Sequence, residues 1–166
     1  MSDATTPLIR AALIAGLAAA VIEMAFILPI QAWLGNSPMI VFQSIASGVS
    51  GTAAYSGGIG SALAGVGWHV LISLVSAGCY VAAATRLPFL HARPLIGGLL
   101  CAVIAYAVMN WVVLPLSAIG YAPTANPGMM LLSFAIHLFG FGIPIAYIAR
   151  WQMRGAVTSG AQSGRS

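Results

Sequence analysis

Four apolar segments, each long enough to cross a lipid bilayer, constrain this chain more than any other feature. They cover residues 8–34, 59–85, 95–119 and 129–150. A helix that crosses the hydrocarbon core needs about 20 residues. None of the segments shows the alternating pattern of about ten residues that is typical of a membrane β-barrel strand. The sequence therefore predicts an all-α fold, an integral membrane four-helix bundle.

The amino-acid composition also indicates that this chain lies in a lipid bilayer and not in water. Of its 166 residues, 60% are hydrophobic and 5% are charged, whereas about a quarter are charged in soluble domains. The formal charge of +4 comes from arginines placed singly or in pairs beside the apolar segments. They form no basic stripe that a phosphate backbone could follow, so no nucleic-acid partner is predicted and the lipid bilayer is the expected one.

The arginines also predict how the bundle is oriented. They lie before the first segment, between the second and third, and at or after the last: Arg10, Arg86, Arg93, Arg150, Arg154 and Arg165. The connections 35–58 and 120–128 contain no Lys or Arg. By the positive-inside rule the arginine side is cytoplasmic, which places both termini in the cytoplasm.

The two ends of the chain predict a retained first span and a disordered tail. The first apolar run, residues 11–34, is longer than the 7 to 15 apolar residues of a signal peptide and carries Glu23 in its middle. After residue 154 the chain is small and polar. We therefore expect a four-span domain over residues 1–154 and a disordered cytoplasmic tail over 155–166.

The first outer connection predicts an additional short helix. Ser37 and Pro38 are a favourable start, and apolar residues then recur at helical spacing. A short interfacial helix is one interpretation and a re-entrant hairpin is the alternative.

Spans one and three share a short pattern over residues 23–31 and 109–117, with Pro29 and Pro115 at the same place in it, and each is followed by a span with one central histidine. This echo predicts two parallel helical hairpins, although chance similarity between apolar segments explains it equally well. Together with Pro144, each proline would free the backbone carbonyl four residues earlier and kink its span.

One strongly polar residue lies at nearly the same depth in each span: Glu23, His69, Asn110 and His137. Each is about eight to eleven residues from the predicted outer end, which is about 12 to 17 Å at about 1.5 Å per residue. That depth is close to the middle of a core about 30 Å thick. A carboxyl at mid-bilayer costs on the order of 2.5 kcal/mol or more, so Glu23 is expected to be functional.

Further polar residues share helix faces with these four and form a supporting stripe: Gln31, Ser73, Ser76, Tyr80, Tyr106, Ser117 and Ser133. Unsatisfied polar groups cost several kcal/mol each in hydrocarbon, so the stripes should converge on the bundle interior. Such residues also simply tie membrane helices together, which is the structural alternative.

Three uses of this cluster follow from its chemistry. A buried carboxyl beside a histidine, which titrates near physiological pH, could exchange protons in a proton or ion relay. Glu23, His69 and His137 also make a set of ligands that suits a metal ion. A haem held by the two histidines is less favoured, because the arginines lie about 20 to 25 Å away along the helices, too far for the propionates.

A structural or assembly subunit of a larger membrane complex, or a homo-oligomer, is the non-catalytic alternative. Enzymatic activity is not expected, because no nucleophile and base pair or phosphate-binding loop can be identified.

Short matches to a known family run through most of the membrane part. They comprise Ile14-Ala15-Gly16 through Pro29, then Gly65-Val66 with His69, Ser73 and Tyr80, then Gly98, Pro115-Leu116 and His137-Leu138. In these residues the chain resembles the YagU-like family of small bacterial inner-membrane proteins. The resemblance implies a multi-pass protein of the bacterial inner membrane without an established catalytic mechanism. Glu23 matches no pattern of that family, so its role rests on its depth.

Overall fold

The computed structural model describes residues 5–120 and 126–163, with the backbone alone for 155–163. Within these ranges the chain is helical and contains no strand, which confirms the all-α prediction. In chain order the elements are α1 (Thr5–Trp33), α2 (Pro38–Ser50), the 3₁₀ helix η1 (Gly51–Ser56), α3 (Gly58–Arg86), α4 (Pro88–Ala92), α5 (Pro94–Val108), the π-helical turn η2 (Met109–Val113), α6 (Leu114–Leu116), α7 (Pro127–Ile136), the π-helical turn η3 (His137–Gly142) and α8 (Ile143–Ser163).

Four stretches of the described chain are long and apolar enough to cross a membrane: Thr5–Trp33, Gly58–Arg86, Pro94–Leu116 and Pro127–Arg154. They match the four predicted segments, except that the third ends at Leu116, before residue 119, and the fourth continues to Arg154, past residue 150. The helix α8 continues to Ser163, past residue 155 where the sequence predicts the start of a disordered tail. Residues 164–166 of that tail lie outside the described residues.

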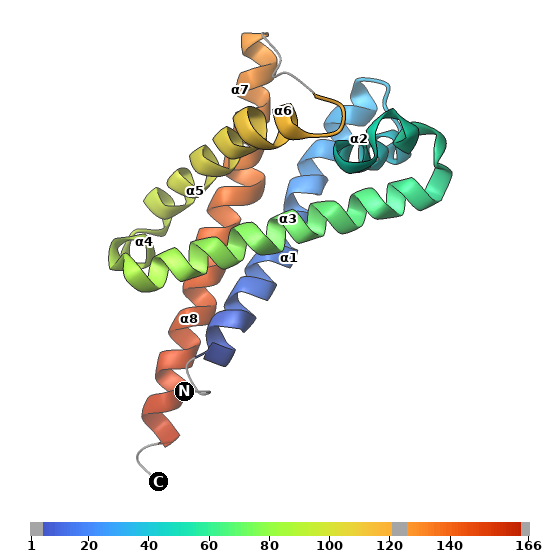
Figure 1. The fold of residues 1–166 in the computed structure, drawn as a ribbon. Helices are drawn as coiled ribbons and strands as arrows, with labels where there is room; N and C mark the ends of the chain where they lie inside the picture. The colour runs from blue at the N-terminus through green and yellow to red at the C-terminus, as the bar shows by residue number, and fades with distance from the viewer. Residues whose placement is uncertain (1–4, 121–125, 164–166) are drawn as a thin grey trace.

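The spans form two helix pairs that meet along α1. The helix α1 packs against α3, and α5 packs against η3 and α8, as expected for two hairpins. Contacts of α1 with η3 and α8 join the pairs, and α3 crosses them obliquely (Figure 1). Arg10 lies near the start of α1, Arg86 ends α3, Arg93 directly precedes α5 and Arg150 lies near the end of the fourth span. These span ends are here called the arginine end. The helices α2 and α6 and the start of α7 lie at the opposite, arginine-free end.

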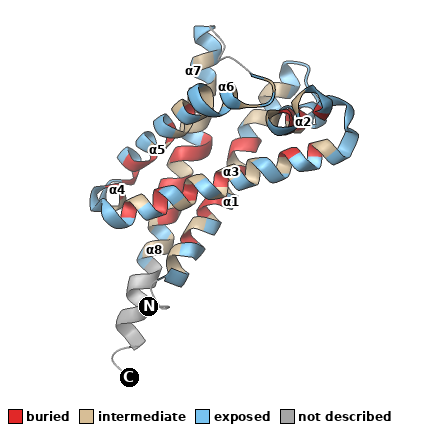
Figure 2. Ribbon diagram, in the orientation of Figure 1, coloured by how far each residue is buried: buried red, intermediate tan, exposed pale blue. Residues whose placement is uncertain are grey.

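The half of the bundle nearer the arginine end has a closed apolar core. Buried residues follow the faces where α1, α3, η3 and α8 meet (Figure 2). The core is rich in alanine, which lets helices approach closely; it consists of Ala11, Ala15, Ala19, Ala77, Tyr80, Val81, Ala84, Leu90, Phe141, Ile145, Ala146 and Ala149. Large apolar side chains on the outer faces are exposed, as lipid-facing residues would be.

The predicted short helix after the first span is present as α2. The Ser37 hydroxyl accepts a hydrogen bond from the Ile40 N–H, which caps its start. Its Gln43 side chain is buried and donates to the Gly58 carbonyl over 3.0 Å. The Ala118 N–H donates to the Gly48 carbonyl over 2.8 Å, which ties α2 to the end of the third span.

Gly65 marks a very close approach of α3 to α2, since a Cβ at this position would collide with the Phe42 carbonyl. Gly67, two residues further along α3, has open space around its Cβ position. We expect Gly65→Ala to lower the free energy of unfolding by about 1–3 kcal/mol through overpacking, and the matched Gly67→Ala not to do so. Unfolding in detergent followed by circular dichroism measures both, and equal stabilities would contradict the close contact.

Two of the spans contain a π-helical turn directly before a proline. In each turn the following N–H donates to the carbonyl five residues earlier, from Leu114 to Met109 and from Ile143 to Leu138. The next residues are Pro115 and Pro144, which have no N–H to donate. Pro29, in contrast, lies within the continuous helix α1. The echo between spans one and three therefore does not extend to local backbone geometry.

Candidate functional site

Two glycines bring the neighbours of α1 close to it on either side of Glu23. A Cβ on Gly16 would lie 2.9 Å from the Cα of Leu74 in α3. A Cβ on Gly140 would lie 3.0 Å from the Cα of Glu23 itself, so the backbone of η3 almost touches α1 there. Because these contacts leave no room for larger side chains, α3 and η3 can both present a histidine to the same carboxylate.

Glu23 lies between the two central histidines. Its Oε2 is 3.9 Å from Nε2 of His69, and its Oε1 is 3.9 Å from Nδ1 of His137. The carboxylate is buried, with 6% of the residue exposed. Both distances are longer than a hydrogen bond but short enough for an ion pair when a histidine is protonated. Each carboxylate oxygen therefore faces an imidazole from a different helix.

The ring nitrogens that face Glu23 are also bonded to backbone carbonyls. His69 Nε2 lies 3.1 Å from the Ala20 oxygen, and His137 Nδ1 lies 2.9 Å from the Ser133 oxygen. A carbonyl only accepts, so in each bond the nitrogen carries the hydrogen. In the neutral rings the lone pairs are then on His69 Nδ1 and His137 Nε2. In each ring the nitrogen nearer the carboxylate therefore carries a hydrogen and not a lone pair.

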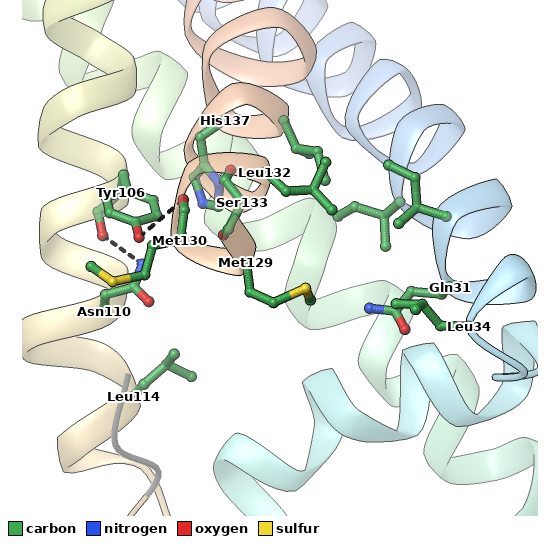
Figure 3. A pocket seen from close by; sticks show the side chains of 13 residues that line it. Gln31, Leu34, Tyr106, Asn110, Leu114, Met129, Met130, Leu132, Ser133 and His137 are labelled. Carbon is green, nitrogen blue, oxygen red and sulfur yellow. Dashed lines mark hydrogen bonds between the residues drawn. The ribbon is translucent and has the colours of Figure 1, made fainter. Parts of the chain in front are cut away.

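A groove of about 260 Å³ leads to this site from the arginine-free end (Figure 3). Its walls come from α1, from the third span and from the start of the fourth: Ile27, Ile30, Gln31, Leu34, Tyr106, Asn110, Leu114, Met129, Met130, Leu132, Ser133, Ile136 and His137. Leu34 and Met129 lie at the ends of their spans, whereas His137 is near mid-span. The groove thus connects the end of the bundle with the ring that faces Glu23.

Asn110 lies in the wall of this groove. It belongs to η2, and its Nδ2 donates to the Tyr106 carbonyl over 2.9 Å. The Tyr106 ring meets the His137 ring edge-on, with centroids 5.5 Å apart, and its hydroxyl donates to the Met130 carbonyl over 3.4 Å. The fourth member of the predicted cluster therefore connects to Glu23 indirectly, through Tyr106 and His137.

The outward part of the predicted polar stripe reaches the groove. Gln31 and Ser133 line it, and the Gln31 side-chain oxygen accepts from Asn36 Nδ2 over 2.8 Å. Ser117 lies at the end of the third span, where its hydroxyl donates to the Leu114 carbonyl.

The inward part of the stripe does not form a continuous polar line. The Ser73 hydroxyl donates to the His69 carbonyl over 2.9 Å, and the Tyr80 hydroxyl to the Leu90 carbonyl over 3.2 Å. Ser76 is half-buried beside the closed core. The hydroxyls of Ser73 and Tyr80 are satisfied by nearby backbone carbonyls. The site is therefore approached from one end by a mostly apolar groove that also carries polar side chains, and it is sealed by apolar packing toward the other end.

The donor geometry does not favour a metal ion between these three side chains. A metal would need the lone pairs of the nitrogens that face the carboxylate, and both nitrogens carry hydrogens bonded to carbonyls. In residues 5–120 and 126–154, no group of three or more His, Cys, Asp or Glu side chains has an arrangement that could hold a metal. The metal and haem interpretations stay predictions without support from this geometry.

The π-helical turns were not predicted, although they carry two of the four candidate residues. His137 is the first residue of η3 and Asn110 the second residue of η2. Such turns are frequent at functional sites, because the extra residue re-aims the side chains around it. The available signal was a proline a few residues after each polar side chain. The apolar groove residues Met129 and Met130 were also missed, since nothing in the pattern separates them from lipid-facing positions.

No protein-family model matches this chain, and neither a curated protein nor a solved structure is significantly similar to it. By the length and apolar composition of four helices among its described residues, it is a helical membrane protein.

Proposed function

We propose that this chain is a proton relay of a membrane, in which Glu23 accepts protons that pass His137. The observation that carries the proposal is the buried carboxylate with an imidazole facing each oxygen, one of them on the wall of a groove. An ionisable group at this depth is rarely kept for packing alone. A carboxyl and two imidazoles are the side chains best suited to exchange protons near neutral pH.

The hydrogen bonds of His137 suggest how a proton reaches Glu23. Nε2 takes up a proton from the groove, which makes the ring an imidazolium with hydrogens on both nitrogens. Nδ1 then releases its hydrogen to Oε1 of Glu23, once the 3.9 Å gap closes to hydrogen-bonding distance, about 2.6–3.2 Å. The carboxylate becomes a neutral acid, the form favoured in apolar surroundings. The ring is left neutral with its hydrogen on Nε2, and a tautomer change resets it.

His69 acts from the opposite side of the carboxylate. Its Nε2–H donates to the Ala20 carbonyl, and the same nitrogen lies 3.9 Å from Oε2. The positive end of this N–H dipole lies near the carboxylate, so it stabilises the charged form of Glu23 before a proton arrives. Onward transfer toward the arginine end requires the apolar core there to open, because the polar residues of that half are bonded to backbone within it.

The direction of uptake depends on the orientation of the chain. The arginines favour a cytoplasmic location for their end, so the groove opens on the outer side and protons enter from there. The resemblance to the YagU-like family supports a place in the bacterial inner membrane and stays a prediction.

Infrared difference spectroscopy on the reconstituted protein tests whether Glu23 binds protons. Besides Glu23, the sequence contains one other acidic side chain, Asp3, so a carboxyl signal has little background. We expect the carbonyl band of a protonated acid to rise and fall with pH in the wild type and in Asp3→Asn. The Glu23 part of the band should be absent from Asp3→Asn/Glu23→Gln. If the band of Asp3→Asn keeps its size and its pH dependence in Asp3→Asn/Glu23→Gln, the proposal is refuted.

A further inference from the structure

The groove that leads to His137 has mostly apolar walls. Eight of the 13 described residues that line it are aliphatic or methionine, and Gln31 is the polar side chain near its mouth (Figure 3). A bound water molecule needs about two to four polar partners, so these walls do not support a chain of water molecules along the whole groove. They suit a mostly apolar molecule instead.

Polar side chains gather in the inner part of the groove. Asn110, Ser133 and His137 line it there, toward mid-span. The neutral His137 ring has its lone pair on Nε2, because Nδ1 donates to the Ser133 carbonyl. The ring is therefore a hydrogen-bond acceptor. Among the described residues that line the groove, none is Arg, Lys, Asp or Glu, so the groove suits a molecule with a neutral polar head.

The Ser133 hydroxyl supplies a donor beside this acceptor. A serine in a helix can donate to the carbonyl three or four residues earlier, as Ser73 does to His69. Before Ser133, the Met130 carbonyl accepts from the Tyr106 hydroxyl instead, and the Ser133 hydroxyl has no hydrogen bond within the described residues. Ser133 and His137 are four residues apart on the wall of the groove. A donor and an acceptor are therefore available together.

We propose that this groove binds a small lipophilic carboxylic acid in its undissociated form. The O–H of the acid donates to Nε2 of His137, and the carbonyl of the acid accepts from the Ser133 hydroxyl. The groove has a volume of about 260 Å³. An apolar cavity of about 150 Å³ binds benzene, and pockets for drug-sized ligands have about 300–1,000 Å³. A molecule such as octanoic acid or benzoic acid fits between these limits.

The bound acid places a proton donor at the nitrogen where the relay begins. Transfer of its proton to Nε2 of His137 breaks the O–H bond and forms an N–H bond, which leaves a carboxylate beside an imidazolium. The carboxylate takes up another proton from water after it has left the groove. This use of the acid rests on the proposed relay, whereas its binding rests on the groove alone.

Methionine methyl groups report on the site, because Met129 and Met130 line the groove and Met39 is exposed on α2 at the same end. We expect octanoic acid, added to the detergent-purified full chain with ¹³C-labelled methionine methyls, to shift the NMR signals of Met129 and Met130 and not that of Met39. Ser133→Ala should bind octanoic acid about fivefold more weakly, the effect of one hydrogen bond worth about 1 kcal/mol. The control Ser76→Ala, on the sealed side of the site, should bind as the wild type does. An equal shift of Met39, or unchanged affinity in Ser133→Ala, overturns the proposal.

The histidine ring nitrogens show where the proton of the acid is bound. The chain contains three histidines, so ¹⁵N labelling of histidine gives few signals, and His137→Gln assigns those of His137. We expect octanoic acid to shift Nε2 of His137 and to leave His91, on α4 at the arginine end, unchanged. Methyl octanoate has no O–H and should not shift Nε2. Because each bound acid brings its proton, the apparent affinity should fall about tenfold for each pH unit above the pKa of a free carboxylic acid, about 4–5.

These outcomes are separate from those that test the relay. A shift of Nε2 with methyl octanoate, or an affinity for octanoic acid that does not change with pH, overturns the proposal even where the Glu23 carbonyl band follows pH. If that band does not follow pH and octanoic acid still binds with the expected shifts, the relay fails and the binding site stands.

Discussion

Replacing Glu23 with glutamine is expected to reduce proton flux through the reconstituted protein to the level of protein-free vesicles. Glutamine has the size and shape of glutamate but does not take up a proton near neutral pH. The glutamine side chain leaves no proton acceptor between His69 and His137. The close contact between Gly140 and α1 is unchanged. The flux is measured with a pH-sensitive dye inside vesicles after a potassium diffusion potential has been applied.

The control for this experiment is Ser76→Ala, which changes a half-buried polar residue on the sealed side of the site. We expect it to retain the wild-type flux. Thermal unfolding of both variants separates loss of function from loss of fold. If Glu23→Gln folds and conducts protons as fast as the wild type, the cluster only holds the helices together.

Replacing His137 with glutamine is expected to reduce the flux about 100-fold, the lower limit of what a positioned acid or base contributes. His137 is the ring that both lines the groove and faces Glu23. Glutamine can keep a hydrogen bond to the Ser133 carbonyl but cannot pick up a proton on one atom and release another. Water in the groove would then have to reach the carboxylate directly, which the buried position of Glu23 opposes.

His69→Gln is the matched comparison, since it removes the other imidazole at the same distance from Glu23. His69 lies on α3, outside the lining of the groove, so its loss should change the flux less than about threefold while lowering stability modestly, by about 0.6 kcal/mol. An equal loss of flux in both variants would contradict the uptake route through His137.

The four spans could be predicted because hydrocarbon thickness fixes how long an apolar helix must be. Capping residues similarly revealed α2, where Ser37 and Pro38 begin the helix as expected. The oblique course of α3 could not be predicted, because it depends on where glycines such as Gly16 and Gly65 allow backbones to touch. Other glycines, such as Gly67 and Gly78, look the same in the sequence, but a Cβ added to them would meet open space.

Depth along each span pointed to the same four polar residues that lie in or beside the site, but depth says nothing of rotation about the helix axis. Glu23, His69 and His137 face one another, whereas Asn110 faces the groove. The sequence likewise suggested polar residues on both sides of the cluster. It could not show that Ser73 and Tyr80 bond to nearby carbonyls and leave that half closed.

The π-helical turns have an evolutionary consequence. A π-helical turn holds one residue more than the α-helical turn it replaces, so deleting one residue from η3 would restore a regular helix. Because the π-helical turn accommodates its extra residue locally, the turns on either side would keep their register, and the side chains within η3, His137 among them, would be re-aimed. His137 would then leave the carboxylate, while the span would still match the thickness of the bilayer. The insertion or loss of a single codon can therefore create or remove this site. Two chains of nearly the same sequence and the same bundle would then differ in whether a histidine faces Glu23.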